Sequence, residues 1–232
     1  FKNERENLES KWNDIKVVIE YGMLTEDKFY DKAESFNLYP TVDDKYFTYE
    51  ELEKKIKKLQ TDKDGNLIIL YAQNKDEQYT YIESAKEKGY EVLLLDSPII
   101  PHLMQKLESK KEKIKFSRVD SDTLENLIKK DEEVISKLTD EEKEKLKPMI
   151  ETAVENEKYT VQLEALDSNS MPFMLAQPEF MRRMKEMQQT GGGAMGNLPD
   201  MYSLIVNTNH ELVGKILNTR TEKKRNSLIK QS

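Results

Sequence analysis

The sequence predicts an α/β and α+β protein, in which a small three-stranded parallel αβα unit is preceded by helices and followed by a second, mixed-sheet α+β domain. Two observations predict this fold class. Three short apolar runs with helical segments between them lie at residues 67–72, 91–96 and 114–119, and this alternation favours a parallel sheet with covering helices. Further along the chain, one helical pattern is followed by strands with apolar and polar residues in alternation, which is typical of a mixed or antiparallel sheet.

A charged stretch at residues 129–137 marks the expected boundary between the two domains. We expect residues 1–66 to be a helical segment, residues 67–130 to be the small αβα unit and residues 134–232 to be the second domain. The 232 residues leave room for two domains of ordinary size.

Residues 1–66 are expected to contain three helices. The first is predicted by apolar residues at helical spacing: Leu8, Trp12, Ile15 and Ile19. The second follows Thr25, and the third begins after Thr48, which forms a capping box with Glu51. Packing in the core is the simplest role for Trp12.

The stretch TDKDGN, residues 61–66, places Asp62, Asp64 and Asn66 as in a calcium-binding loop. However, Leu67 occupies the position of the loop glycine and Gln73 that of the last glutamate. We therefore predict a polar turn rather than a calcium site.

Within the αβα unit, a helix is expected to open at Asn74 and end at Gly89, and a second helix to cover residues 101–110. No G-x-G-x-x-G motif or P-loop occurs at either strand-to-helix turn. An enzyme built on this sheet is an alternative that a phosphate or cofactor near 73–76 or 96–98 would support, but the sequence offers no pair of nucleophile and base.

The second domain should begin with a helix that the Thr139–Glu142 capping box starts and that ends near Val154. Strands are expected at residues 159–166, 172–176 and 202–208. Asn209 is expected to cap the closing helix.

Composition excludes several classes of protein. The chain has no cysteine, which excludes disulfides, thiolate zinc sites and a cysteine nucleophile and fits a cytoplasmic location. The net charge is −7, and residues 134–232 carry equal numbers of acidic and basic residues, so no nucleic-acid partner is expected. No apolar run is long enough for a membrane span. His102 and His210 lack the neighbours of a metal site, and no metal is expected.

Methionine is concentrated in one segment. Seven of the ten methionines fall within residues 171–201, where an amphipathic helix is expected between Pro178 and the glycines that begin at Gly191. One face of this helix carries Phe180, Met181, Met184 and Met187. Such a stripe packs as core in many proteins. However, methionine adapts to many partners, and a glycine-rich flank suits a mobile helix that binds varied ligands.

Four stretches carry a resemblance to a known family: KNERENLESKWNDIKVVIEYGM, YIESAKEKGYEVLLLD, FMRRMKEM followed by glycines, and LPDMYSLIVNTNH. Together they resemble the heat-shock protein 90 chaperones in their bacterial HtpG form. The resemblance covers nearly the whole chain, in order. It implies that residues 1 to about 130 are the later part of the middle domain and that the rest is most of the C-terminal dimerisation domain.

The resemblance also implies roles for residues. The methionine helix would be the client-contacting helix, through Phe180, Met181, Met184 and Met187. His102, Leu103 and Met104 stand where the family places middle-domain client contacts. The implied partners are unfolded or partly folded client proteins and, in the complete protein, a second copy of the chain.

ATP and magnesium would be cofactors of the complete protein, while this chain would need none. We expect it to have no catalytic activity, because the family's ATP-binding domain and catalytic arginine loop precede the matching part. The alternative to a client-contact role is a purely structural dimerisation module, with the methionine helix packed as core.

Overall fold

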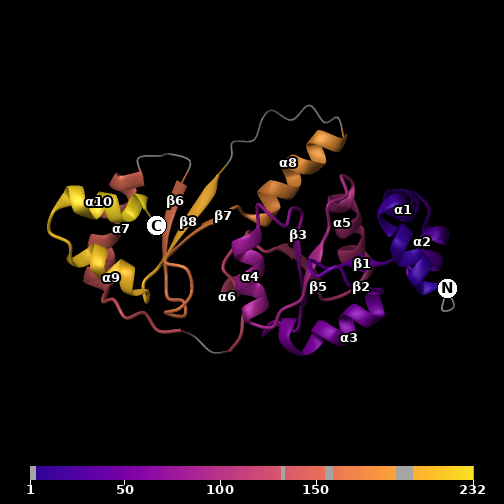
Figure 1. The fold of residues 1–232 in the computed structure, drawn as a ribbon, viewed down its shortest axis with the longest axis horizontal. Coiled ribbons are helices and arrows are strands. Elements are labelled where there is room, and N and C mark those ends of the chain that lie inside the picture. Colours follow the sequence, from indigo (N-terminus) through magenta and orange to yellow (C-terminus); the bar gives the residue numbers. More distant parts are fainter. Residues whose placement is uncertain (1–3, 132–133, 155–158, 192–200, 232) are drawn as a thin grey trace. The chain divides into compact units, whose positions relative to one another are not determined.

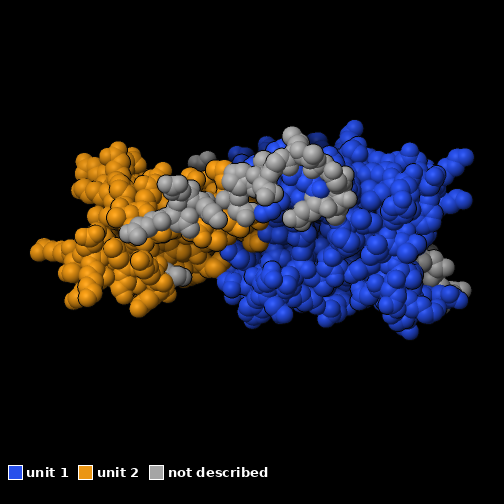
Figure 2. Space-filling model, turned by 90° about the horizontal axis from the view of Figure 1, so that it is seen from above, with its two compact units in different colours: residues 1–119, 127–129, 179–196 blue, residues 120–126, 130–178, 197–232 orange. Residues whose placement is uncertain are grey.

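The computed structural model describes residues 4–131, 134–154, 159–191 and 201–231. The chain forms two compact units, which are coloured separately in Figure 2. Unit 1 consists of residues 1–119, 127–129 and 179–196, and unit 2 consists of residues 120–126, 130–178 and 197–232.

Unit 1 is built around a three-stranded sheet (Figure 1). Its helices are α1 (Arg5–Thr25), α2 (Asp27–Ala33), α3 (Tyr49–Gln60), α4 (Tyr79–Glu87), α5 (Ile100–Lys110) and α8 (Glu179–Gly191). Its strands are β1 (Tyr39–Pro40), β2 (Tyr46–Phe47), β3 (Leu67–Ala72), β4 (Val92–Leu94) and β5 (Ile114–Arg118). The sheet has the order β4-β3-β5, and β3 pairs with both neighbours in parallel. The predicted parallel sheet is therefore confirmed.

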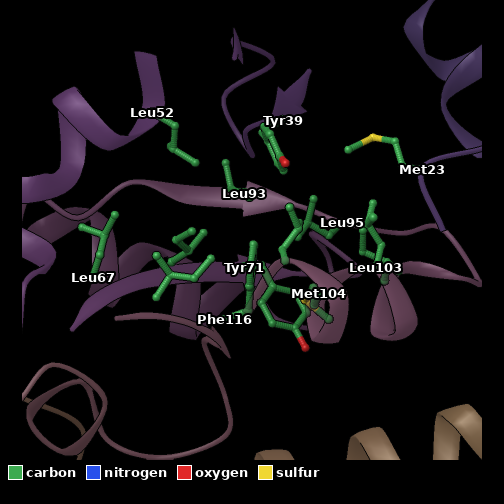
Figure 3. Packing of buried hydrophobic residues seen from close by; sticks show 14 of the residues in the cluster. Met23, Tyr39, Leu52, Leu67, Tyr71, Leu93, Leu95, Leu103, Met104 and Phe116 are labelled. Atoms are coloured by element: carbon green, nitrogen blue, oxygen red, sulfur yellow. The ribbon is translucent and has the colours of Figure 1, made fainter. Parts of the chain in front are cut away.

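The core of unit 1 surrounds the central strand β3, all six residues of which are buried. A strand in the middle of a covered parallel sheet is apolar on both faces, which explains the uninterrupted run LIILYA. Residues from α1, α3 and α5 complete the core, among them Met23, Leu52, Leu103 and Met104 (Figure 3). Trp12 is also buried, as predicted.

The third helix begins as its sequence predicts. The Thr48 hydroxyl accepts a hydrogen bond from the Glu51 N–H, and the Glu51 carboxylate accepts one from the Thr48 N–H, at 3.4 and 2.8 Å. This reciprocal pair is the predicted capping box.

Helix α4 begins later than predicted. It starts at Tyr79 rather than at Asn74, because the Asn74 side chain accepts hydrogen bonds from the N–H groups of Asp76 and Glu77 and forms a turn. The helix ends as expected before Gly89, whose positive φ of 76° favours glycine.

The stretch at residues 61–66 is the polar turn that the sequence predicts. The Asp62 carboxylate accepts hydrogen bonds from the N–H groups of Asp64 and Asn66, at 3.0 and 2.7 Å. Gly65 has a positive φ of 81°, which closes the turn without strain.

Unit 2 contains a mixed sheet. Its elements are α7 (Asp140–Val154), β6 (Tyr159–Glu164), β7 (Phe173–Ala176), β8 (Tyr202–Asn207), α9 (Glu211–Asn218) and α10 (Glu222–Lys230), and the short α6 (Leu124–Leu127) lies where the chain passes between the units. The sheet order is β6-β8-β7, with β6 parallel and β7 antiparallel to β8. This arrangement confirms the predicted mixed sheet.

The cap of α9 differs from the prediction. The His210 imidazole, through Nδ1, accepts a hydrogen bond from the Leu212 N–H, so His210 is the N-cap. Asn209, the predicted cap, instead donates through its amide to the carbonyls of Ile135 and Leu166. Its side chain is therefore engaged in holding two loops of unit 2 together.

Candidate functional site: the methionine-rich helix

Helix α8 carries the methionine stripe, and its buried side is formed by charged residues. Arg182 has only 3% of its surface exposed. Its guanidinium pairs with Glu179 at 2.7 Å and Glu186 at 2.5 Å on the same helix. It also donates a hydrogen bond to the hydroxyl of Tyr71 on β3. The helix therefore faces the sheet of unit 1 with an arginine.

The Glu179 carboxylate accepts hydrogen bonds from four groups. Oε1 accepts from the Tyr71 hydroxyl at 2.7 Å, from Arg182 at 2.7 Å and from Arg183 at 2.6 Å. Oε2 accepts from the N–H of Arg118 on β5 at 3.0 Å. Burial raises the pKa of Glu179, but the two guanidinium groups and these hydrogen bonds outweigh it and hold the pKa below its ordinary value. Glu179 is therefore ionised at neutral pH.

Arg183 connects α8 to a second helix of unit 1. Its guanidinium contacts both carboxylate oxygens of Glu108 on α5, at 2.9 and 3.3 Å, and donates to the Phe116 carbonyl at 2.6 Å. Glu108 in turn accepts from the Phe116 N–H at 2.7 Å. The two-point geometry fixes orientation as well as distance. We call Tyr71, Glu108, Glu179, Arg182 and Arg183 the anchor cluster.

The apolar stripe lies on other parts of the helix surface. Phe180 is 71% exposed. Met181, Met184 and Met187 are each partly exposed, and none of them is fully buried. The glycine-rich flank at 192–200 falls outside the described residues. In the described part of the helix, Phe180 is thus accessible to a partner, whereas most of the surface of the three methionines is covered and only a part of each is accessible.

The second predicted set of contact residues lies on α5, and its three members differ in exposure. His102 is partly exposed. Leu103 and Met104 are 1% and 0% exposed and belong to the core of unit 1 (Figure 3). A partner could reach Leu103 and Met104 only if this core opened, so in the closed core neither side chain is available for contact.

Sequence reasoning missed the anchor cluster, although part of its signal was present. Glu179 lies three residues before Arg182 and four before Arg183, and Arg182 lies four before Glu186. These are the spacings at which opposite charges meet on a helix. They left undetermined that Tyr71 and Glu108, far away in the sequence, would bury this side.

Comparisons with known proteins identify relatives along nearly the whole chain. The chain is 47% identical over 222 residues to the chaperone protein HtpG of Bacteroides fragilis, a match covering 94% of this chain and 33% of that protein. It is 42% identical over 227 residues to HtpG of Porphyromonas gingivalis, covering 96% of this chain and 33% of that protein. The chain belongs to the HtpG chaperone family. This confirms the resemblance to the heat-shock protein 90 family.

The chain spans about a third of the length of these HtpG relatives. No family model matches it. Among solved structures, the middle domain of a Plasmodium falciparum heat shock protein is similar over 48% of this chain and 47% of that chain, with 17% identity and a TM-score of 0.37.

The described residues of this HtpG-family chain contain no group of three or more His, Asp or Glu side chains arranged to hold a metal ion. In the same ranges, every helix is too short or too polar to cross a bilayer.

Proposed function

We propose that α8 is a client-contact element of an HtpG-type chaperone, and that Phe180, Met181, Met184 and Met187 bind apolar segments of non-native proteins. The observation that carries this proposal is the orientation of the helix. Its arginines face the sheet, Phe180 is largely exposed, and Met181, Met184 and Met187 each keep a smaller part of their surface exposed. A stripe that served only as core would be buried.

The chemistry of the stripe supports a broad choice of clients. Methionine has an unbranched, polarisable side chain that adapts to differently shaped apolar partners, and Phe180 adds a large flat surface. Non-native proteins share exposed apolar side chains rather than a common shape. His102 is included as a second, partly exposed contact on α5, on the strength of the family resemblance.

The first prediction tests the stripe with a matched pair of variants. Phe180→Ser should weaken suppression of a model client's aggregation about five- to thirtyfold, because about 1–2 kcal/mol of apolar contact with the client is lost. Val18→Ser on α1 is the control, since Val18 is 73% exposed and Phe180 71%. Aggregation is followed by light scattering as a function of chaperone concentration.

Two results would contradict the proposal. One is equal client protection by both variants, which would show that exposed apolar area anywhere on the chain suffices. The other is a large loss of stability on replacing Met181, Met184 and Met187 together by serine. That loss would favour the alternative of a structural module in which the stripe packs as core.

Residues 1–130 are proposed as middle-domain segments and residues 134–232 as a dimerisation domain, on the strength of the family resemblance. ATP binding and hydrolysis, with magnesium, are proposed for the complete protein rather than for these residues.

The second prediction is that the complete protein is a homodimer and that deleting residues 134–232 makes it a monomer. Sedimentation velocity tests this, and a dimer that survives the deletion would contradict it.

A further inference from the structure

Helix α8 is held on unit 1 by the hydrogen bonds and ion pairs of the anchor cluster. Each member of the anchor cluster is charged or polar, and their contacts join α8 to β3, β5 and α5. Phe180, the most exposed apolar residue of the helix, faces solvent. The described hydrogen bonds and ion pairs therefore fix α8 on the sheet through buried and partly buried polar groups.

An interface held by polar contacts opens more readily than one held by apolar contacts. When buried ion pairs separate into water, each charge regains its hydration, and this gain offsets much of the lost attraction. Separating a packed apolar face has no such compensation. Interfaces that open and close are accordingly richer in polar contacts than permanent ones.

We propose that the anchor cluster is a releasable latch. Closed, it positions α8 so that the apolar stripe is presented in one fixed orientation; opened, it frees the helix from unit 1 while the unit stays folded. Arg182, Arg183 and Glu179 are the positioning residues on α8. Their contact partners are Tyr71 on β3 and Glu108 on α5. The client role of the stripe rests on the proposed function, but the latch itself does not.

The geometry of the receptors supports a specific fit rather than a general attraction. Tyr71 belongs to the buried central strand, and its hydroxyl meets both Glu179 and Arg182. Burial and the Glu179 carboxylate raise the pKa of Tyr71 above its ordinary value, so the hydroxyl stays protonated and can donate to Glu179. Glu108 is oriented by its own hydrogen bond from the Phe116 N–H.

Hydrogen exchange of the purified protein, measured without client, tests the third prediction. Arg182→Met should raise the exchange rate of α8 amides at least tenfold, while β3 amides keep their protection. Arg183→Lys keeps the charge but loses the two-point contact with Glu108, and should give a smaller rise. The matched control is Arg220→Met, which removes an arginine that is exposed and should leave α8 unchanged.

Three results would overturn the latch. Unchanged α8 exchange in both Arg182→Met and Arg183→Lys would show that other contacts hold the helix. Loss of protection in β3 together with α8 would show that the helix belongs to the cooperative core of unit 1. A rise of equal size in Arg220→Met would show that the effect is not local.

The readout separates the latch from the proposed function. Exchange in the absence of client reports docking alone, whereas light scattering with Phe180→Ser reports client binding alone. If Phe180→Ser left client protection unchanged, the latch would still stand. If the exchange of α8 were unchanged, the client role of the stripe would still stand.

Discussion

Replacing Met104 by alanine is expected to lower the free energy of unfolding by about 2–5 kcal/mol, the range for cutting back a fully buried methionine. Met104 is 0% exposed and lies in one core cluster with Leu103, Leu107 and Phe116. Alanine would remove its contacts and leave a cavity, which a closely packed core fills only in part.

Urea unfolding followed by circular dichroism measures this change, and Phe180→Ala is the comparison. Phe180 is 71% exposed, so its removal should alter the free energy of unfolding by no more than about 0.5 kcal/mol. If Met104→Ala instead left stability unchanged and reduced client protection, the core at α5 would be open in solution. Met104 would then be a candidate client-contact residue.

The parts of the fold that the sequence predicted well depend on neighbouring residues. The run LIILYA is apolar at every position and became the buried central strand. The Thr48–Glu51 capping box involves one turn of chain and formed as expected. Signals of this kind need no knowledge of distant partners, because both halves of the interaction lie within a few residues.

Elsewhere, several neighbouring residues could make the same interaction, and tertiary contacts chose between them. Asn209 and His210 stand side by side before α9, and both types of side chain can accept from a helix N–H. His210 became the cap because the amide of Asn209 bonds to Ile135 and Leu166. Asn74 likewise closes a turn, which delays the start of α4 to Tyr79.

The candidate site was predictable in part. Periodicity identified the helix and its apolar stripe, and it left open whether that stripe is core or surface. It gave no indication that Arg182 would be buried, because burial of an arginine requires partners that satisfy it. The distant partners on this side of α8, Tyr71 for Arg182 and Glu108 for Arg183, lie more than seventy positions earlier in the chain. The tertiary fold brings these two residues into contact with α8.

The last prediction concerns Glu20, a carboxylate buried in unit 1. Glu20 lies on α1 with 6% of its surface exposed. Its pKa is raised to about 7, chiefly by burial and to a lesser extent by nearby Asp96, while Ser97 and Lys16 offset only part of the rise. Its ordinary value in an unfolded chain is 4.5. The folded state therefore binds the Glu20 proton more tightly than the unfolded state does.

This difference sets the sign of the pH dependence. Below pH 4.5 Glu20 is protonated in both states and carries no penalty. As the pH rises toward about 7, the unfolded state loses its proton first and is stabilised, so folding stability falls. Above that pH the loss is complete, at about 3 kcal/mol, because the pKa rises from 4.5 in the unfolded chain to about 7 in the folded protein.

Glu20→Gln should remove this penalty, because glutamine has nearly the same shape and no charge to bury. We expect the variant to exceed the wild type in free energy of unfolding, by about 2–3 kcal/mol more at about pH 8 than at about pH 5. Urea unfolding at both pH values measures the difference. Asp14→Asn is the matched control, since it removes a carboxylate that is exposed on the same helix. A constant difference between wild type and Glu20→Gln at the two pH values would show that Glu20 keeps its ordinary pKa and that solvent reaches it in the folded protein.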